Sequence, residues 1–322
     1  MDSNNSYIEW SALRSVWFSQ YHSLGQTKVV VALIENPGLY NRGDGLLVYT
    51  GVDPSDNTQK LLISYQLYDH LRLSLEAVLQ RLDKNIPSPR SLHPSRVAWT
   101  NVTGVYVKSS KELEKLHQCC KKISKRLHRM QNAKAQVDLA LSLLERKSHV
   151  FVSIDIEAYE LDHSILLEIG WTLYDSKRRV LQDQHYMNSR YRHLANGKYV
   201  NDERLSFNFG TSVWCTLDQA LAELHADLEW ATKRDGGYVL VGHNLDSDIA
   251  YLRGVKFMWP CKDGNTSLDV QESAAITVLN TESMYGVYRN DLHNPPSLSG
   301  TLTELGIEHW HMHNAGELTL ND

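Results

Sequence analysis

Two carboxylates end an apolar segment at residues 150–157, Val-Phe-Val-Ser-Ile-Asp-Ile-Glu. The apolar run predicts a buried β-strand, in which side chains two residues apart point to the same face. Asp155 and Glu157 would therefore share one small space at the end of a buried element. Two ionised carboxylates in such a place shift their pKa values or bind a cation, and acidic oxygens without nearby Cys or His favour Mg²⁺ or Mn²⁺. The alternative is an edge strand whose two acids face water.

Two further segments carry residues suited to the same chemistry. Residues 238–252 predict a second apolar strand, a polar turn and the start of a helix that holds Asp246 and Asp248. Residues 311–317, His-Met-His-Asn-Ala-Gly-Glu, form a His-rich turn near the end of the chain. With His309 and His311, His313 could form a transition-metal site, but no Cys or acid stands at ligand spacing, so we favour a different use of His313.

The order of these three segments is specific. Asp-x-Glu, then Gly-His-Asn-x-x-x-Asp, then His-Asn-Ala-Gly resembles the three motifs of the DEDDh superfamily of 3′ to 5′ exonucleases, which have the ribonuclease H fold. Residues 154–170, 196–200 and 207–210 are further similar to a fungal branch, described as supporting the DEAD-box mRNA-export helicase. The resemblance covers about residues 148–317.

The resemblance assigns roles to individual residues. It implies that Asp155, Glu157 and Asp248 bind two Mg²⁺ or Mn²⁺ ions, and that His313 is the general base for the attacking water. Asp246 is expected to cap a helix instead. The nucleic-acid contacts expected near this site are Tyr159, which could stack on a terminal base, and Asn244.

The fourth acid of the family is missing from its expected place. The resemblance puts an Asp five residues after His313, where this chain has Leu318. Glu317 and Asp322 are possible substitutes, although Glu317 is turned by roughly 100° on a helix and Asp322 lies one turn further along. The chain also stops where the family continues through a closing helix. A truncated end, a divergent end and lost activity therefore all stay open.

Three functions are compatible with these residues. We favour a metal-dependent 3′ to 5′ exonuclease that acts on single-stranded nucleic acid, with RNA ahead of DNA. A catalytically impaired pseudo-nuclease would need only a groove and a basic surface, and it would bind nucleic acid or act as an adaptor in RNA metabolism or mRNA export. A ribonuclease H-type endonuclease fits less well. The resemblance also implies an RNA helicase or mRNA-export factor as a partner.

The net charge of −5 conceals an asymmetry between the two halves of the chain. Residues 1–148 carry 20 Lys and Arg against 13 Asp and Glu, whereas residues 149–322 carry 13 against 25. A nuclease domain this acidic needs a cationic surface elsewhere to hold a polyanion. Residues 108–134 predict such a surface on a helix, although a charge run is often only a solvated face. The proposed nucleic-acid contacts there are Lys121, Lys122, Lys125, Arg126 and Arg129.

We predict three parts: a smaller α+β region at residues 1–107, a long basic amphipathic helix at 108–148, and an α/β domain at 149–322. The last would be a ribonuclease H-like mixed sheet with helices on both faces, its C-terminal helix apparently truncated. Strands are expected at residues 28–35, 46–50, 60–66 and 97–107, and a helix at 70–82. A last strand is expected at 267–270. The apolar stripe from Leu113 to Leu144 is expected to pack on the N-terminal domain.

The remaining features indicate the compartment. The longest apolar run, residues 29–34, is too short to span a bilayer, and the first residues lack a secretory signal, so no membrane role is expected. Four cysteines show neither zinc spacing nor a disulfide framework. A location in the cytoplasm or the nucleus, or both, follows as an expectation.

Overall fold

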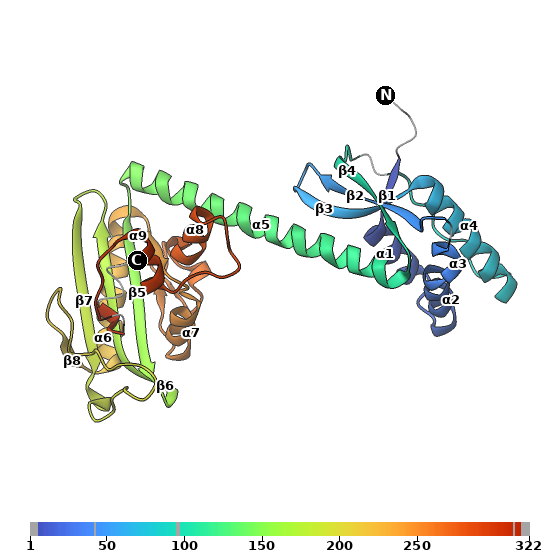
Figure 1. Ribbon diagram of the computed structural model, residues 1–322. Coiled ribbons are helices and arrows are strands. Elements are labelled where there is room, and N and C mark those ends of the chain that lie inside the picture. Colours follow the sequence, from blue (N-terminus) through green and yellow to red (C-terminus); the bar gives the residue numbers. More distant parts are fainter. Residues whose placement is uncertain (1–5, 42, 95–96, 312, 317–322) are drawn as a thin grey trace. The chain divides into compact units, whose positions relative to one another are not determined.

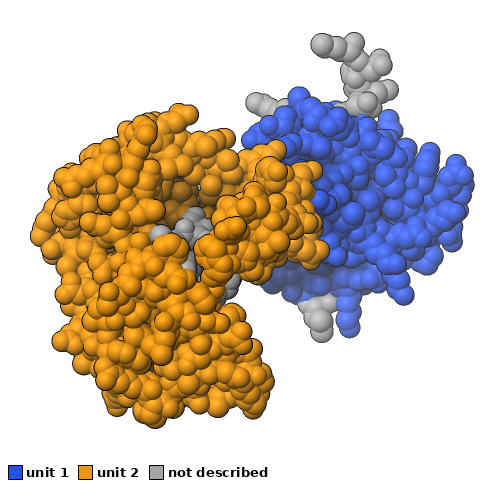
Figure 2. All heavy atoms as spheres, turned by 60° about the vertical axis from the view of Figure 1, so that its left-hand side comes forward, with its two compact units in different colours: residues 1–131 blue, residues 132–322 orange. Residues whose placement is uncertain are grey.

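The computed structural model describes residues 6–41, 43–94, 97–311 and 313–316. Contacts divide the chain into two compact units, residues 1–131 and residues 132–322 (Figure 2). The long helix α5 (Ser110–Arg146) contributes residues to both. The division predicted from the sequence, with boundaries at 107 and 148, stays a prediction. Within the described residues, no helix combines the length and the apolar composition that a membrane span needs.

Unit 1 contains a four-stranded antiparallel sheet in the order β1-β3-β2-β4. Its core joins the aromatic and aliphatic side chains of the sheet to those of the helices, with Trp17, Ile63 and Leu75 fully buried. The strands are β1 (Tyr7–Glu9), β2 (Leu46–Asp53), β3 (Thr58–Ser64) and β4 (Thr100–Val107). The helices before α5 are α1 (Trp10–Gln20), α2 (Leu24–Glu35), α3 (Pro37–Tyr40) and α4 (Tyr65–Leu82).

The strand predicted at residues 28–35 is wrong, because these residues belong to α2. The run of β-branched and aliphatic residues favours a strand locally. However, the Ser23 side chain caps the helix by accepting a hydrogen bond from the Gln26 backbone N–H. Val30, Leu33 and Ile34 then lie at helical spacing in the core, where α2 packs against α4. Tertiary packing at a period of 3.6 therefore overrides the local preference.

The apolar stripe of α5 packs on the core of unit 1 only at its start, so the prediction is wrong for the rest of the stripe. Leu113 and Cys120 are buried in unit 1, whereas Leu141 and Leu144 are 55% and 43% exposed. Steps of three and four average 3.5 residues, so such a stripe drifts by about 20° per heptad around a straight helix. Over the four heptads from Leu113 to Leu141 it turns away by about 80°. In unit 2 the helix buries Ala140 and Leu143 instead.

Unit 2 is built on a six-stranded mixed sheet in the order β12-β9-β5-β6-β7-β8 (Figure 1). β6 is antiparallel to both β5 and β7, whereas β9 and β12 run parallel to β5. The main strands are β5 (Val150–Tyr159), β6 (Asp162–Asp175), β7 (Val180–Asn188), β8 (Val213–Cys215), β9 (Tyr238–Gly242) and β12 (Ala275–Asn280). The helices are α6 (Leu217–Asp235), α7 (Asp246–Gly254), α8 (Thr281–Tyr288) and α9 (Leu298–Leu305). Short elements are η1 (Ser189–Tyr191), β10 (Trp259–Pro260), β11 (Thr266–Ser267) and η2 (Val270–Glu272).

Helices cover both faces of this sheet. Val150, Val152 and Ile154 of β5 pack against α6, which starts with the capping box of Thr216 and Gln219. Phe151 points to the other face, where it packs with the end of α5 and with α8. Because side chains alternate along a strand, Asp155 and Glu157 lie on the same face as Phe151. The predicted mixed sheet with helices on both faces is confirmed, and it is a ribonuclease H-like arrangement.

The last strand of the sheet is β12, not residues 267–270 as the sequence predicted. Thr266 and Ser267 pair only with β10, in a two-residue ladder. Asp269 then caps the short helix η2 by accepting a hydrogen bond from the Gln271 backbone N–H. Side-chain capping of this kind competes with strand pairing. The strand therefore forms only after residue 274.

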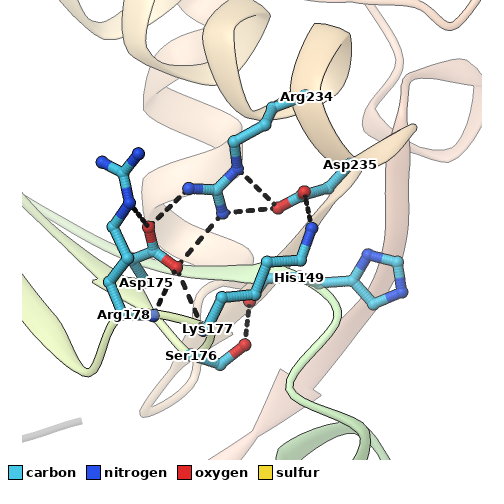
Figure 3. A network of polar contacts seen from close by, with 7 residues as sticks. All are labelled: His149, Asp175, Ser176, Lys177, Arg178, Arg234 and Asp235. Atoms are coloured by element: carbon cyan, nitrogen blue, oxygen red, sulfur yellow. Dashed lines mark hydrogen bonds and ion pairs between the residues drawn. The ribbon is translucent and has the colours of Figure 1, made fainter.

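An ion-pair network lies at the end of the sheet where β5 begins (Figure 3). Arg234, in the last turn of α6, contacts the carboxylates of both Asp175 and Asp235. Lys177 contacts Asp235 as well. Hydrogen bonds from Arg234 lower the pKa of Asp175, and the hydrogen bonds to Asp235 outweigh its burial, so its pKa is lowered too. The network ties the β6–β7 turn to α6 and leaves the opposite end of β5 for the acids.

Candidate metal and nucleic-acid site

The first two acids lie at the C-terminal end of β5, on one face of the sheet. In the β5–β6 ladder Asp155 stands opposite Gly170, and Glu157 stands opposite Glu168. The Glu157 side chain is 18% exposed. This placement agrees with the strand geometry that the Asp-x-Glu spacing predicts.

The third acid reaches the same place from the next strand. Because β9 runs parallel to β5, both strands end at the same edge of the sheet. After β9 the chain turns at Asn244, whose φ is 69° and whose backbone N–H donates to Asn280 Oδ1 at 3.3 Å. Asp248 follows in the first turn of α7, and its Oδ1 accepts the Ile156 backbone N–H at 3.0 Å. That bond holds Asp248 beside the strand, level with the gap between Asp155 and Glu157.

The histidine motif joins the acids from the far end of the chain. His313 Nδ1 lies 3.9 Å from Glu157 Oε1, and the imidazole is 47% exposed. The next residue, Asn314, is fully buried, donates to the Glu203 backbone oxygen at 2.9 Å and accepts the Gly316 N–H at 3.0 Å. His311 Nδ1 lies 3.0 Å from Glu203 Oε2. The buried asparagine thus fixes the turn that presents His313.

Gly170 allows this turn to lie directly on the sheet. A Cβ atom at position 170 would lie 2.5 Å from the carbonyl carbon and oxygen of Ala315 and 2.7 Å from the Gly316 nitrogen. Real Cβ atoms do not approach backbone atoms so closely, so only glycine fits. Since Gly170 stands opposite Asp155, the turn of residues 313–316 lies close above the first acid of the Asp-x-Glu pair.

A fourth carboxylate, Glu168, was not predicted as part of the site. It is 3% exposed and its Oε2 lies 2.7 Å from His185 Nε2. His185 Nδ1 in turn lies 2.8 Å from Ser212 Oγ. Burial raises the pKa of Glu168 despite the opposing effect of its hydrogen bond with His185. The sequence feature that could have indicated Glu168 is its position inside the apolar run of residues 165–171. A carboxylate is rarely buried in a core strand unless it has a partner.

The acids repel each other in the absence of a cation. Burial, followed by the charges of Glu168 and Asp248, raises the pKa of Glu157 to about 8. Burial likewise raises the pKa of Asp248 to about 7, against the opposing hydrogen bond from Ile156. Raised pKa values that have these causes mark a place where a cation would stabilise the ionised carboxylates.

A pH dependence of stability follows for the metal-free protein. Both folded-state pKa values lie above the usual values of about 4.3 for Glu and 3.9 for Asp. At a pH between the unfolded-state and the folded-state pKa, the folded state therefore binds more protons than the unfolded state. The stabilising contribution is complete below about pH 4 and is lost as the pH rises through about 7 to 8. Urea unfolding in a chelator is expected to show a falling free energy of unfolding over this range. The Glu157→Gln variant should show a flatter decline, and an equal decline would contradict the assignment.

The other predicted residues differ in exposure and position. Tyr159 is partly buried at the end of β5, and Asn244 and Asp246 are exposed. His309 Nε2 lies 2.8 Å from Ser299 Oγ and does not join His313. Glu317, Leu318 and Asp322 lie outside the described residues. Five basic residues of α5 are predicted nucleic-acid contacts, and all of them are exposed and belong to unit 1: Lys121, Lys122, Lys125, Arg126 and Arg129.

A cavity of about 340 Å³ opens beside the acids. Asp155 and Asp248 line one part of it. The rest is lined by the turn after β9, the start of α8 and the proline-rich segment before α9: His243, Asn244, Glu282, Pro295, Pro296, Ser297 and Leu298. Its volume lies in the range of small-molecule sites, and its lining combines polar and apolar groups.

The donor set fits a hard divalent cation. Carboxylate oxygens from two elements meet at one edge of the sheet, and such oxygens are what Mg²⁺ and Mn²⁺ take in proteins. Among the residues that the structure describes, no three His, Cys, Asp or Glu side chains lie close enough together to form a complete metal site.

The fold and these motifs agree with comparisons to known proteins. Residues 150–320 match the DEDDh family described as DNA polymerase III subunit epsilon-like, C-terminal domain, over more than half of the chain. The chain belongs to this family. The resemblance deduced from the three motifs is therefore confirmed.

Three fungal proteins are similar in sequence. An uncharacterized nucleolar protein of Schizosaccharomyces pombe is 28% identical over 232 residues, which cover 70% of this chain and 86% of that protein. An uncharacterized protein of Saccharomyces cerevisiae is 26% identical over 194 residues, covering 55% of this chain and 40% of that protein. The Saccharomyces cerevisiae protein named Good for full DBP5 activity protein 2 is 23% identical over 209 residues, covering 59% and 37%.

Proposed function

We propose that this protein is a metal-dependent 3′ to 5′ exonuclease that acts on single-stranded nucleic acid, with RNA as its substrate. One observation carries the proposal: Asp248 is bonded to the backbone of β5 between Asp155 and Glu157, and His313 faces Glu157 at 3.9 Å. Three segments far apart in sequence thus place three carboxylates and an imidazole at one edge of the sheet. Membership of a nuclease-like family supports this reading.

Asp155, Glu157 and Asp248 would hold the Mg²⁺ or Mn²⁺ ions. Two such ions supply an activated water and stabilise the leaving 3′ oxygen of a phosphodiester. His313 presents Nδ1 to Glu157, so its Nε2 is the nitrogen that takes the proton of the attacking water. Asn314 and Gly170 keep that imidazole in position through the buried turn.

The cavity beside the acids is suited to the last nucleotide of a strand. The scissile phosphate would lie beside Asp155 and Asp248, and Pro295, Pro296 and Leu298 would provide an apolar surface for a sugar or a base. A volume of about 340 Å³ lies in the range of sites that hold a small molecule, which suits a single nucleotide. This supports removal of nucleotides from an end rather than cleavage within a strand.

Two features of the relatives bear on substrate and partner. One is named as nucleolar and another for the full activity of DBP5. We infer from these names an RNA substrate and an RNA helicase or mRNA-export factor as partner.

A second function is favoured by one observation, which is that the family position of the fourth acid holds Leu318. In a pseudo-nuclease, Asp155, Glu157 and Asp248 would bind a single ion, and the protein would hold nucleic acid without cleaving it. Loss of supporting groups around a metal site typically costs 10- to 100-fold in affinity or activity. Metal binding and cleavage therefore have to be measured separately.

Metal binding can be tested through thermal stability. A ligand at about a hundred times its Kd stabilises the folded state by about 2.7 kcal/mol, which raises the Tm of a domain of this size by about 5 to 10 °C. We expect Mn²⁺ to raise the Tm of the chain by this amount at neutral pH. The Asp248→Asn variant should lose the increase, and the Asp246→Asn variant, changed at an exposed neighbour, should keep it. An equal increase in all three proteins would contradict the assignment.

A further inference from the structure

A basic segment without acids lies close to the site. The segment from residue 189 to residue 201, Ser-Arg-Tyr-Arg-His-Leu-Ala-Asn-Gly-Lys-Tyr-Val-Asn, connects β7 to the approach of β8 and is called the basic loop below. It carries three Lys or Arg and neither Asp nor Glu, although residues 149–322 hold 13 basic residues against 25 acidic ones. A positive surface inside an acidic domain indicates attraction of a polyanion.

Each cation of the basic loop is paired with an aromatic ring. Arg190 lies 5.6 Å from the Tyr191 ring centre, Arg192 lies 4.6 Å from that of Trp214, and the Lys198 ammonium lies 4.8 Å from that of Tyr199. All three cations are exposed. Tyr199 is 70% exposed, so its ring is accessible to a base. Aromatic rings interleaved with cations are how proteins bind single strands without reading their sequence.

The basic loop is fastened to the strand that carries the metal acids. The Glu160 carboxylate accepts the backbone N–H groups of Lys198 and Tyr199 at 2.8 Å each, and of Val200 at 3.1 Å. Asn196 Oδ1 accepts the Glu160 N–H at 2.9 Å, and its amide donates to the Ala158 oxygen at 3.1 Å. Desolvation raises the pKa of Glu160, but the backbone N–H groups of residues 197–200 together outweigh it, so the pKa is lowered. A loop held by five hydrogen bonds presents Tyr199 in a fixed place.

The basic loop lies close enough to the acids to contact a nucleic-acid strand whose end is in the site. Glu160 follows Glu157 by three residues, a length of about 10 Å along an extended chain. We propose that the basic loop binds single-stranded nucleic acid on the 5′ side of the terminal nucleotide, with one base stacked on Tyr199 and phosphates held by Arg190, Arg192 and Lys198. This rests on the proposed exonuclease function and adds to it the place where the strand is gripped.

The basic loop should contribute to the binding of long single strands but not of short ones. In Ca²⁺, which slows cleavage, the Tyr199→Ala variant is expected to bind a fluorescent uridine dodecamer about 5- to 100-fold more weakly than the unchanged chain, because each stacked base contributes strongly to affinity. A diuridine, too short to reach Tyr199, should bind equally to both. The Tyr199→Phe variant should keep the affinity. Tyr288→Ala, which removes another exposed tyrosine in the same unit, is the matched control.

Salt dependence tests the phosphate contacts. Each contact to a single strand adds about 0.7 to the slope of log K against log salt, so changing Arg190, Arg192 and Lys198 to Gln should lower the slope by about 2. Dodecamer binding that Tyr199→Ala leaves equal to that of Tyr288→Ala would overturn the proposal. If the two variants bind the dodecamer equally and the unchanged chain still cleaves RNA, only the proposed binding of the strand by the basic loop is refuted. If the unchanged chain neither binds nor cleaves RNA, the proposed function fails together with it.

Discussion

Replacing Asp155 with asparagine is expected to lower the rate of nucleotide removal by about a hundredfold or more. The change keeps the size of the side chain but removes the charge that faces Gly170 at the end of β5. Loss of a group that merely supports a metal ligand already costs 10- to 100-fold, so loss of a ligand should cost at least the upper value. The measurement is the initial rate of mononucleotide release from a single-stranded RNA in Mn²⁺.

Two controls separate this effect from misfolding. Asp246→Asn changes an exposed acid two residues from Asp248 and should leave the rate within about twofold, as surface changes usually do. The Tm of the Asp155→Asn variant in a chelator should stay close to that of the unchanged chain, because asparagine keeps the size of the side chain. An unaffected rate would show that Asp155 is not a ligand.

The Gly170→Ala variant is expected to lose activity about as completely as His313→Ala, although it changes no chemical group. The new Cβ would lie 2.5 Å from Ala315, so the turn of residues 313–316 must rise from the sheet and carry His313 away from Glu157. General acid–base catalysis contributes about 10²- to 10⁴-fold, and a shift of 1 Å can cost about a hundredfold. We therefore expect a loss of about a hundredfold or more.

Gly254→Ala provides the matched control for this change. A Cβ at position 254, at the end of α7, meets no atom within 4 Å, and its backbone is not left-handed. Its rate should stay unchanged. The double variant Gly170→Ala with His313→Ala should be no slower than either single variant, because both remove the same contribution. Independent, multiplying losses would contradict the idea that Gly170 acts by positioning His313.

Much of the site could be deduced from the sequence because its acids end apolar segments. Asp155 and Glu157 end an apolar run that predicts a buried strand, and Asp248 follows a second run at the spacing of a helix start. Parallel strands end at the same edge of a sheet, so the pattern alone brings these residues together. The mixed sheet with helices on both faces follows from the same pattern and is confirmed.

Other features depend on contacts between distant segments. Glu168 looked like part of a strand motif, and only the fold shows that it lies opposite Glu157 and bonds His185. The hydrogen bonds from the backbone N–H groups of residues 198–200 to the Glu160 carboxylate likewise follow from no side-chain pattern in the sequence. The helix α2 was missed because its β-branched run favours a strand, and packing against α4 decides otherwise.

The most direct test of the account follows the shortening of a 5′-labelled single-stranded RNA by the unchanged chain in Mn²⁺. We expect a ladder that shortens one nucleotide at a time from the 3′ end, that a chelator abolishes, and that Asp155→Asn and His313→Ala do not produce. An intact label that all three proteins bind but do not shorten would contradict the exonuclease and identify a protein that only holds nucleic acid.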